Sequence, residues 1–340
     1  IVRLVGSEMC IRDRHTSAAL SALRYRSAKP MRLPPARYLL QRIIFAGVTV
    51  LVLVSVVFVL VRLTPGGPFD GERQLPEAVE KNLRAAYHLD EPISQQYLRY
   101  LSSLLTGDLG PSFRNKDFTV NELIAAGLPT SAALGLLAMT FALISGVTIG
   151  TFAGLHPDSW TDRLLMALNN LNLATPTLIT APLLVLLFAV MLSWLPAGGA
   201  DGWPHFLLPA IALALPFSGA IARLCRGSVV DTLLADHLRT ARAKGLGQNQ
   251  LVMRHVLPLS LLPVLSYLGP ASAALLTGSV VVEQIFAMPG IGRYFVEGAL
   301  NNDYTLVMGV VVVYSAFIAS FNLLVDLAYA WLDPRLVIAQ

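Results

Sequence analysis

The chain has 340 residues, of which 55% are hydrophobic and only 14% carry a charged side chain. Soluble domains usually contain about 25% charged residues, so this composition argues against a soluble enzyme and against a disordered chain. The net charge of +4 gives no indication of nucleic-acid binding, and two cysteines are too few for a disulfide framework or a cysteine metal site.

The first 30 residues do not resemble a signal peptide, because no apolar stretch follows their basic residues. Met31 leads directly into the first long apolar stretch. We expect the natural chain to begin at Met31, and we interpret residues 1–30 as a non-native or disordered extension. Residues 31–340 are expected to form one membrane domain. The intact mass of the natively expressed protein would test this expectation.

Six long stretches of the chain contain no Asp, Glu, Lys or Arg. A helix rises about 1.5 Å per residue and the hydrocarbon core of a bilayer is about 30 Å thick, so each stretch can cross once. The longest, residues 164–200, is interrupted by asparagines and by Pro176, and its tail is rich in proline and glycine; we therefore predict one crossing followed by a loop. The predicted spans are residues 40–62, 128–155, 165–192, 206–228, 258–284 and 304–328. The predicted fold class is all-α, a polytopic bundle of six transmembrane helices.

The distribution of basic residues predicts the orientation of this bundle. Arginine and lysine cluster before the first span and between the fourth and fifth spans, whereas residues 193–205 contain none and residues 286–303 contain only Arg293. Cytoplasmic loops carry the excess of basic residues. Both termini are therefore predicted to be cytoplasmic, and the segment 63–127 is predicted to be external.

The segment 63–127 is too polar to cross the membrane and too long for a turn. Ile93, Tyr97, Leu101 and Leu104 recur in it at helical spacing, and Gly107 follows them. This pattern predicts an amphipathic helix that lies on the bilayer surface, packs on the bundle or receives a partner; the sequence favours the first two. A turn and a second short amphipathic helix are predicted between residues 288 and 303.

Glycines and ionisable residues within the spans indicate how the bundle works. Gly146, Gly150 and Gly154 repeat every four residues, a spacing that allows another helix to approach closely, and we interpret it as helix packing within the chain. Glu283 and Asp326 lie at span ends, where we expect them to be solvated. A proton or ion relay needs several buried ionisable groups. Their scarcity argues against an ion-coupled secondary transporter.

No catalytic constellation is visible in the sequence. It contains no H-E-x-x-H zinc motif, no G-x-S-x-G nucleophile motif and no G-x-x-x-x-G-K-[ST] phosphate loop. We therefore expect no enzymatic activity and no cofactor or metal bound by this chain. Uphill transport by such a protein would require energy from another chain.

The loop at residues 229–258, which we call the basic loop, is the most informative segment. A helix is predicted over residues 231–244, and Gly245-Leu246-Gly247 would end it. Asn249 could cap a second short helix that ends before Pro258. The basic residues Arg239, Arg242 and Lys244 lie on the first helix. On charge alone, they could simply set the orientation of the chain.

The spacing of the basic loop resembles the EAA loop of importer permeases of the ATP-binding-cassette class. The family pattern is Glu-Ala-Ala, three residues, Gly, nine residues, Ile, one residue and Leu-Pro. Here the pattern reads Arg239-Thr240-Ala241, Gly245, His255 and Leu257-Pro258 at the same spacing. Arg239 and Thr240 replace Glu-Ala, and His255 replaces Ile, in the manner of the peptide-importer branch. The residues assigned by this resemblance to ATPase coupling are Arg239, Thr240, Ala241, Arg242, Lys244, Gly245, Leu257 and Pro258.

Further segments extend the resemblance over about residues 31–336. They include residues 63–70, 96–101, 107–113, 289–292, 303–304 and 333–335, and together they are similar to permease subunits of oligopeptide importers. The resemblance implies the type I importer architecture, a bacterial inner-membrane location and the transport of oligopeptides or dipeptides. Nickel and glutathione importers of the same class remain alternatives.

The resemblance also implies four kinds of partner. These are a second homologous permease subunit forming a heterodimer, two cytoplasmic ATPase subunits that use ATP and Mg²⁺, an external peptide-binding protein that is periplasmic or lipid-anchored, and the lipid bilayer. The ATPases would receive the basic loop in a surface cleft. The residues that bind substrate cannot be assigned from one sequence.

Overall fold

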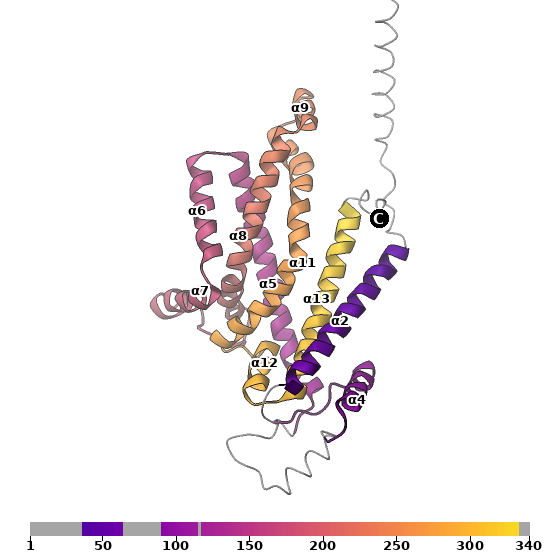
Figure 1. Ribbon diagram of the computed structural model, residues 1–340. Coiled ribbons are helices and arrows are strands. Elements are labelled where there is room, and N and C mark those ends of the chain that lie inside the picture. Colours follow the sequence, from indigo (N-terminus) through magenta and orange to yellow (C-terminus); the bar gives the residue numbers. More distant parts are fainter. Residues whose placement is uncertain (1–35, 64–89, 115–116, 333–340) are drawn as a thin grey trace, which may run out of the picture.

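The computed structural model describes residues 36–63, 90–114 and 117–332 (Figure 1). The expected extension at residues 1–30, part of the segment 63–127 that was predicted to be external, and the motif at residues 333–335 lie outside the described residues. The described chain is helical throughout, apart from its connecting loops and one isolated bridge between Pro111 and Thr119. The predicted all-α membrane fold is thereby confirmed.

Within the described residues, five helices are long and apolar enough to cross a membrane. They are α2 (Ala36–Leu63), α5 (Val120–Leu155), α8 (Pro204–Leu234), α11 (Leu257–Ile285) and α13 (Tyr304–Leu332). The shorter helices are α4 (Ile93–Leu105), α6 (Trp160–Ala174), α7 (Thr177–Leu184), α9 (Asp236–Ala243), α10 (Gln248–Leu251) and α12 (Ile291–Leu300). Two wider helical turns, η1 (Val185–Met191) and η2 (Val252–Val256), continue α7 and precede α11.

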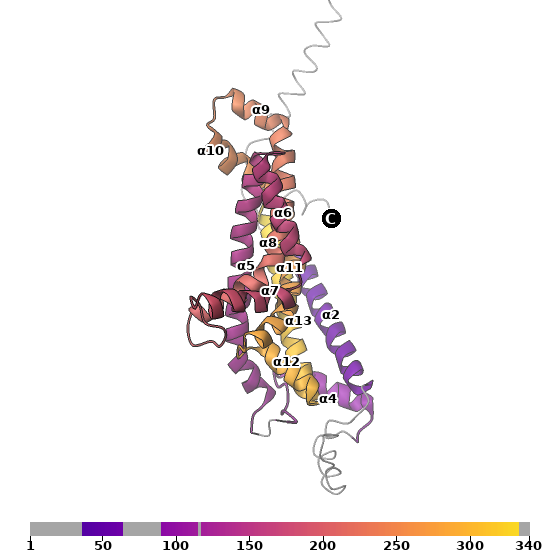
Figure 2. The same cartoon turned by 90° about the vertical axis from the view of Figure 1, so that its left-hand side faces the viewer.

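A sharp bend divides the region in which one continuous span, residues 165–192, was predicted. The helices α6 and α7 with η1 meet at an angle of 106°. The cause is Pro176, because a proline disfavours helical backbone at the residue before it, and Thr175 is extended with ψ 120°. The α7 helix consequently projects sideways from the bundle (Figures 1 and 2). The spans number five in the described chain, or six if the bent pair counts as one.

The centre of the bundle is the long contact between α5 and α8. A Cβ atom at Gly146 would lie 2.7 Å from Cγ2 of Ile221, and one at Gly154 would lie 2.8 Å from Cβ of Val229. Ile221 and Val229 are completely buried there. The helix backbones come this close only because three glycines on one face of α5 leave room for α8.

The α2 and α13 helices form a second layer of the bundle. An ion pair between Arg42 on α2 and Asp326 on α13, at 3.2 Å, joins the two helices. In Figure 1 this pair of helices diverges from α8 and α11 toward the end that carries α9. At the opposite end, the predicted amphipathic helix α4 packs on α2. The Tyr97 hydroxyl lies 2.6 Å from Oγ of Ser55, and its ring packs against Phe58.

We predict that adding one methyl group at the α5–α8 contact destabilises the protein. The Cβ of Gly150→Ala would meet the carbonyl oxygen of Ala222 and lie 2.7 Å from Cβ of Cys225. Overpacking of this kind typically costs about 1–3 kcal/mol. Thermal unfolding of the detergent-solubilised protein would measure the loss.

The matched control is Gly227→Ala on α8, where nothing lies within 4 Å of the added methyl group. Alanine is favoured over glycine in a helix by about 0.5–1 kcal/mol, so the control should be as stable as the wild type or more stable. Equal stability of both variants would contradict the close packing of α5 on α8.

Candidate functional site

The basic loop is a compact projection at one end of the bundle, formed by α9, α10 and η2 (Figure 2). Its first helix is separated from α8 by Ala235, whose backbone is extended with ψ 141°. Leu238 and Ala241 turn inward from α9 and are buried, as are Leu251 and Val256 from the second half of the loop. These four side chains belong to the main apolar core, so the projection is anchored to the bundle.

Gly245 ends α9 through its backbone conformation. Its φ angle is +79°, in the left-handed region that glycine adopts without strain. The Gly245 N–H donates to the Arg242 carbonyl at 2.9 Å, and the Leu246 N–H donates to the Ala241 carbonyl at 3.4 Å. This pair of bonds is the Schellman motif, which satisfies carbonyls at a helix end. No atom crowds the position of a Gly245 Cβ, so the requirement for glycine here is conformational.

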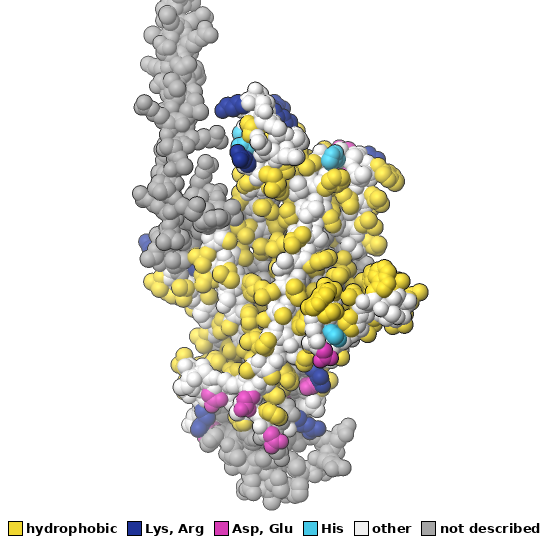
Figure 3. Space-filling model, turned by 180° about the vertical axis from the view of Figure 1, so that it is seen from behind, with side chains coloured by type: hydrophobic (Ala, Val, Ile, Leu, Met, Phe, Trp, Pro, Cys, Tyr) yellow, Lys and Arg dark blue, Asp and Glu magenta, His cyan; other side chains and the backbone are white. Residues whose placement is uncertain are grey.

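The polar side chains of the loop point away from the bundle. Arg239 is 74% exposed, and its nearest carboxylate, Asp236, is 97% exposed at 3.8 Å, a pair that contributes little to stability. Arg242, Lys244 and Thr240 are also exposed. Figure 3 shows lysine and arginine gathered at this end of the molecule. The loop therefore presents a basic surface held on an apolar base, a form suited to docking in a cleft on another protein.

The second half of the loop runs without interruption into the membrane. The α10 helix, η2 and α11 form one helical segment in which Leu257 is half-buried and Pro258 is exposed. A proline inside a helix lacks an N–H and clashes with the carbonyl four residues before it. The wide turn η2 directly precedes this proline and provides the room. A displacement of the loop would consequently be passed directly to α11.

A partly buried ion pair fixes the helices near the basic loop. Arg226 on α8 donates from Nε and Nη2 to the two carboxylate oxygens of Asp162, at 2.8 and 2.6 Å, and Asp162 is only 3% exposed. Such a bidentate pair specifies both distance and orientation. Arg226 belongs to the basic residues between the fourth and fifth apolar stretches, but its pairing with Asp162 was not predicted. The only local signal was Ser159, which caps α6 three residues before Asp162.

At the opposite end, Glu283 forms the hub of a buried polar cluster. The Ser131 hydroxyl donates to one of its carboxylate oxygens at 2.7 Å, and the Gly292 N–H donates to the other at 2.8 Å. Ser131 Oγ in turn accepts a bond from the Ile291 N–H at 2.9 Å. The expectation that Glu283 is solvated was wrong, because its side chain is completely buried. The carboxylate satisfies the free amides at the start of α12.

Asp303 forms a second carboxylate hub at the same end. It caps α13 by accepting from the Leu306 N–H at 3.2 Å, and it accepts from the Arg114 N–H at 3.2 Å and from the Ser112 hydroxyl. Thr305 adds a bond to the carbonyl of Pro111 at 2.6 Å. Segments about 190 residues apart in sequence, both noted for their resemblance to peptide importers, are therefore joined here.

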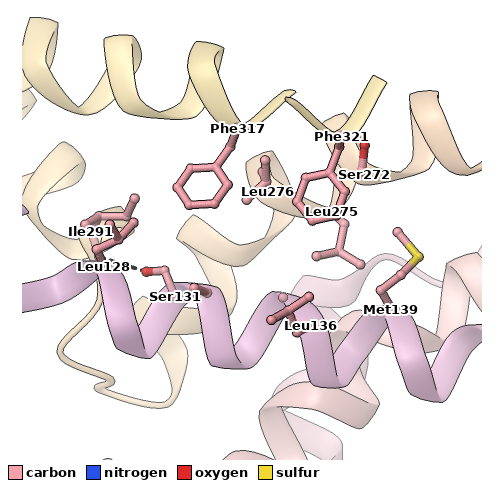
Figure 4. A pocket seen from close by; sticks show the side chains of 12 residues that line it. Leu128, Ser131, Leu136, Met139, Ser272, Leu275, Leu276, Ile291, Phe317 and Phe321 are labelled. Atoms are coloured by element: carbon pink, nitrogen blue, oxygen red, sulfur yellow. Dashed lines mark hydrogen bonds between the residues drawn. The ribbon is translucent and has the colours of Figure 1, made fainter. Parts of the chain in front are cut away.

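A small apolar cavity of about 100 Å³ lies among α5, α11, α12 and α13 (Figure 4). Leu136, Leu275, Phe317 and Phe321 line it, and Ser131 lies at its edge beside Ile291. The described residues contain no group of three or more His, Cys, Asp or Glu side chains that could hold a metal ion. The features that the structure brings out are thus an exposed basic projection at one end and two polar hubs at the other.

Comparison with known proteins identifies two matching family models. The "Binding-protein-dependent transport system inner membrane component" family matches residues 146–338, and the corresponding N-terminal family matches residues 36–135. The oligopeptide transport system permease protein OppB of Escherichia coli (strain K12) is 45% identical over 302 residues, which cover 88% of this chain and 99% of that protein. OppB of Haemophilus influenzae is 43% identical with the same coverage. The dipeptide transport system permease protein DppB of Bacillus subtilis is 44% identical over 301 residues, covering 88% and 98%.

We predict that Gly245→Ala loosens the turn after α9. An alanine in the left-handed conformation costs about 1 kcal/mol. The amide of Leu246, which closes the Schellman motif, should then exchange its hydrogen about fivefold faster. Hydrogen–deuterium exchange measured by mass spectrometry on the detergent-solubilised protein would detect this change.

The control for this prediction is Gly247→Ala, two residues further along the loop. Gly247 has a φ angle of −65° and a ψ angle of 153°, which alanine adopts freely, and no atom lies within 4 Å of the added methyl group. Equal exchange at Leu246 in both variants would show that the left-handed turn is not what holds this segment.

Proposed function

Because the chain belongs to the family of binding-protein-dependent transport system inner membrane components, we propose that it is the permease subunit of an ATP-driven importer of oligopeptides. It is a transport subunit and not an enzyme; hydrolysis of ATP belongs to partner subunits. The observation that carries the proposal is the basic loop. It is an exposed basic projection at the position of the family's EAA spacing, and it is continuous with a membrane-spanning helix.

The partners follow from this role. Two cytoplasmic ATPase subunits would receive basic loops, one from this chain and one from a second, homologous permease subunit. The loop end of the bundle is then cytoplasmic, and both termini are on that side. The opposite end, with α12 and the segment around Ser112, faces an external peptide-binding protein that delivers the substrate. These placements agree with the excess of basic residues in the loop.

The mechanism is alternating access driven through the loop. ATP binding brings the two ATPases together and moves the docked loops with them. Since α10, η2 and α11 form one helical segment, this movement tilts α11 within the membrane. The bundles of the two permease subunits then exchange an inward-facing opening for an outward-facing one. Gly245 keeps the loop compact enough to be carried as one piece.

Oligopeptides are the proposed substrates because two of the three relatives described above carry that name, over nearly their whole length. Dipeptides, glutathione and nickel are the alternatives within the same class. Competition in an uptake assay with a labelled tetrapeptide separates them. Unlabelled peptides of four or five residues should compete, whereas nickel and glutathione should not.

The energy source distinguishes this proposal from an ion-coupled carrier that works alone. Peptide uptake into cells that carry this chain and its partners should stop when ATP is depleted. It should continue when the proton gradient is collapsed while ATP is maintained. The opposite pattern would establish an ion-coupled carrier and exclude the proposed function.

We predict that Gly245→Trp abolishes peptide uptake without preventing membrane insertion. The substitution combines a strained left-handed backbone with a bulky side chain on the surface that would enter the ATPase cleft. The amount of chain in the membrane fraction would be compared with the initial rate of uptake. The control is Gly47→Trp on α2, an exposed glycine with nothing within 4 Å of its Cβ position. Normal uptake by Gly245→Trp would refute the docking role of the loop.

A further inference from the structure

The buried cluster around Glu283 lies at the far end of the helix that carries the basic loop. The α11 helix has 29 residues and is therefore about 43 Å long. The basic loop ends in the first turn of α11, and Glu283 lies in its last turn. We propose, on the basis of the function proposed above, that Glu283 and Ser131 are positioning residues that fasten α12 to α11. The movement of the loop is thereby passed to the external surface.

The hydrogen bonds of the cluster make the connection between α11 and α12 stiff. Glu283 is completely buried and Ser131 is 2% exposed. If their hydrogen bond broke, no water could replace it, and a carboxylate or a hydroxyl would lose a hydrogen-bond partner. The cluster joins three elements, because Ser131 comes from α5, Glu283 from α11, and the two amides from the start of α12. Buried polar networks of this kind hold their members in one arrangement when all partners are satisfied.

Close packing at three glycines leaves no space in which α12 could tilt against α11. A Cβ at Gly290 would lie 2.5 Å from Oγ of Ser131, and one at Gly292 would lie 2.7 Å from Cα of Val280. From the other side, a Cβ at Gly127 would lie 3.0 Å from the backbone of Gly290. The start of α12 is thus enclosed by backbone and by the cluster itself.

The connection continues from α12 to the external segment. The α12 helix leads through a short turn to Asp303, which caps α13 and accepts bonds from Ser112 and from the Arg114 amide. A movement of α11 would therefore displace the surface that faces the external binding protein. In the reverse direction, a movement caused by docking of that protein would be passed to the ATPases through the same residues.

Two variants test the cluster without a large change in side-chain volume. Ser131→Ala removes the bond to Glu283 and leaves the Ile291 amide without its acceptor; Glu283→Gln replaces a carboxylate oxygen by an amide nitrogen. The matched control is Ser272→Ala, because Ser272 is 3% exposed on α11 and its hydroxyl bonds only the carbonyl of Gly269. The complete transporter, with both permeases, both ATPases and the binding protein, would be reconstituted in lipid vesicles.

The readout is the number of peptides taken up per ATP hydrolysed, with and without the peptide-loaded binding protein. Both cluster variants should assemble and keep the basal rate of ATP hydrolysis, while uptake per ATP falls about tenfold. Ser272→Ala should behave as the wild type. A merely structural role would lower ATP hydrolysis and uptake together, and that result, or wild-type coupling in both variants, would overturn the proposal.

A second measurement leaves the residues of the cluster unchanged and records a distance between spin labels outside it. Spin labels at Asn249→Cys on α10 and Ala299→Cys on α12, in a transporter whose native cysteines are replaced by alanine, report the distance along the whole connection. This distance should stay the same when ATP binds; a shift or a second distance would overturn the rigid connection. ATP-dependent uptake by the wild type tests the proposed function separately, so the failure of one claim is distinguishable from the failure of the other.

Discussion

The need to satisfy buried carboxylates inside an apolar bundle fixes two of the short helices, α6 and α12, and the start of α13. Asp162, Glu283 and Asp303 are the buried carboxylates of the described chain. Asp162 lies in the first turn of α6 and Asp303 directly before α13, whereas Glu283 lies in the last turn of α11. Asp162 pairs with Arg226, Glu283 accepts bonds from Ser131 and the start of α12, and Asp303 caps α13. If one partner were lost, a buried charge or amide would have no hydrogen-bond partner, which costs free energy. These contacts therefore fix the connections between the long helices.

The three carboxylates lie at the two ends of the molecule, one near the basic loop and two at the opposite end. Near the basic loop, the pair of Asp162 and Arg226 holds α6 against α8, while the three glycines of α5 bring α8 into the centre. At the other end, Glu283 and Asp303 hold α12 and the segment around Ser112 on the bundle. The α11 helix connects the two ends, which is the arrangement that an importer driven from the cytoplasm requires.

The sequence predicted the long helices well because their apolar stretches are uninterrupted. It predicted the helix stop at Gly245 from the residue type, and the positive φ angle gives the reason. It did not predict the break at Ala235, which divides the expected helix over residues 231–244 and carries no glycine or proline signal. The bend at Pro176 was visible only as a proline, which can either kink or end a helix. The burial of Glu283 depends on Ser131, 152 residues earlier, and no local pattern reveals such a pairing.

The proposed function depends most on docking of the basic loop on ATPases. Purification of a tagged chain from native membranes, followed by mass spectrometry of the proteins that accompany it, tests this claim directly. A P-loop ATPase and a second six-span permease should accompany the wild type, and the ATPase alone should be lost when the chain carries Gly245→Trp. Recovery of the chain by itself or as a homo-oligomer would contradict the docking of the loop on ATPases and favour a carrier that works alone.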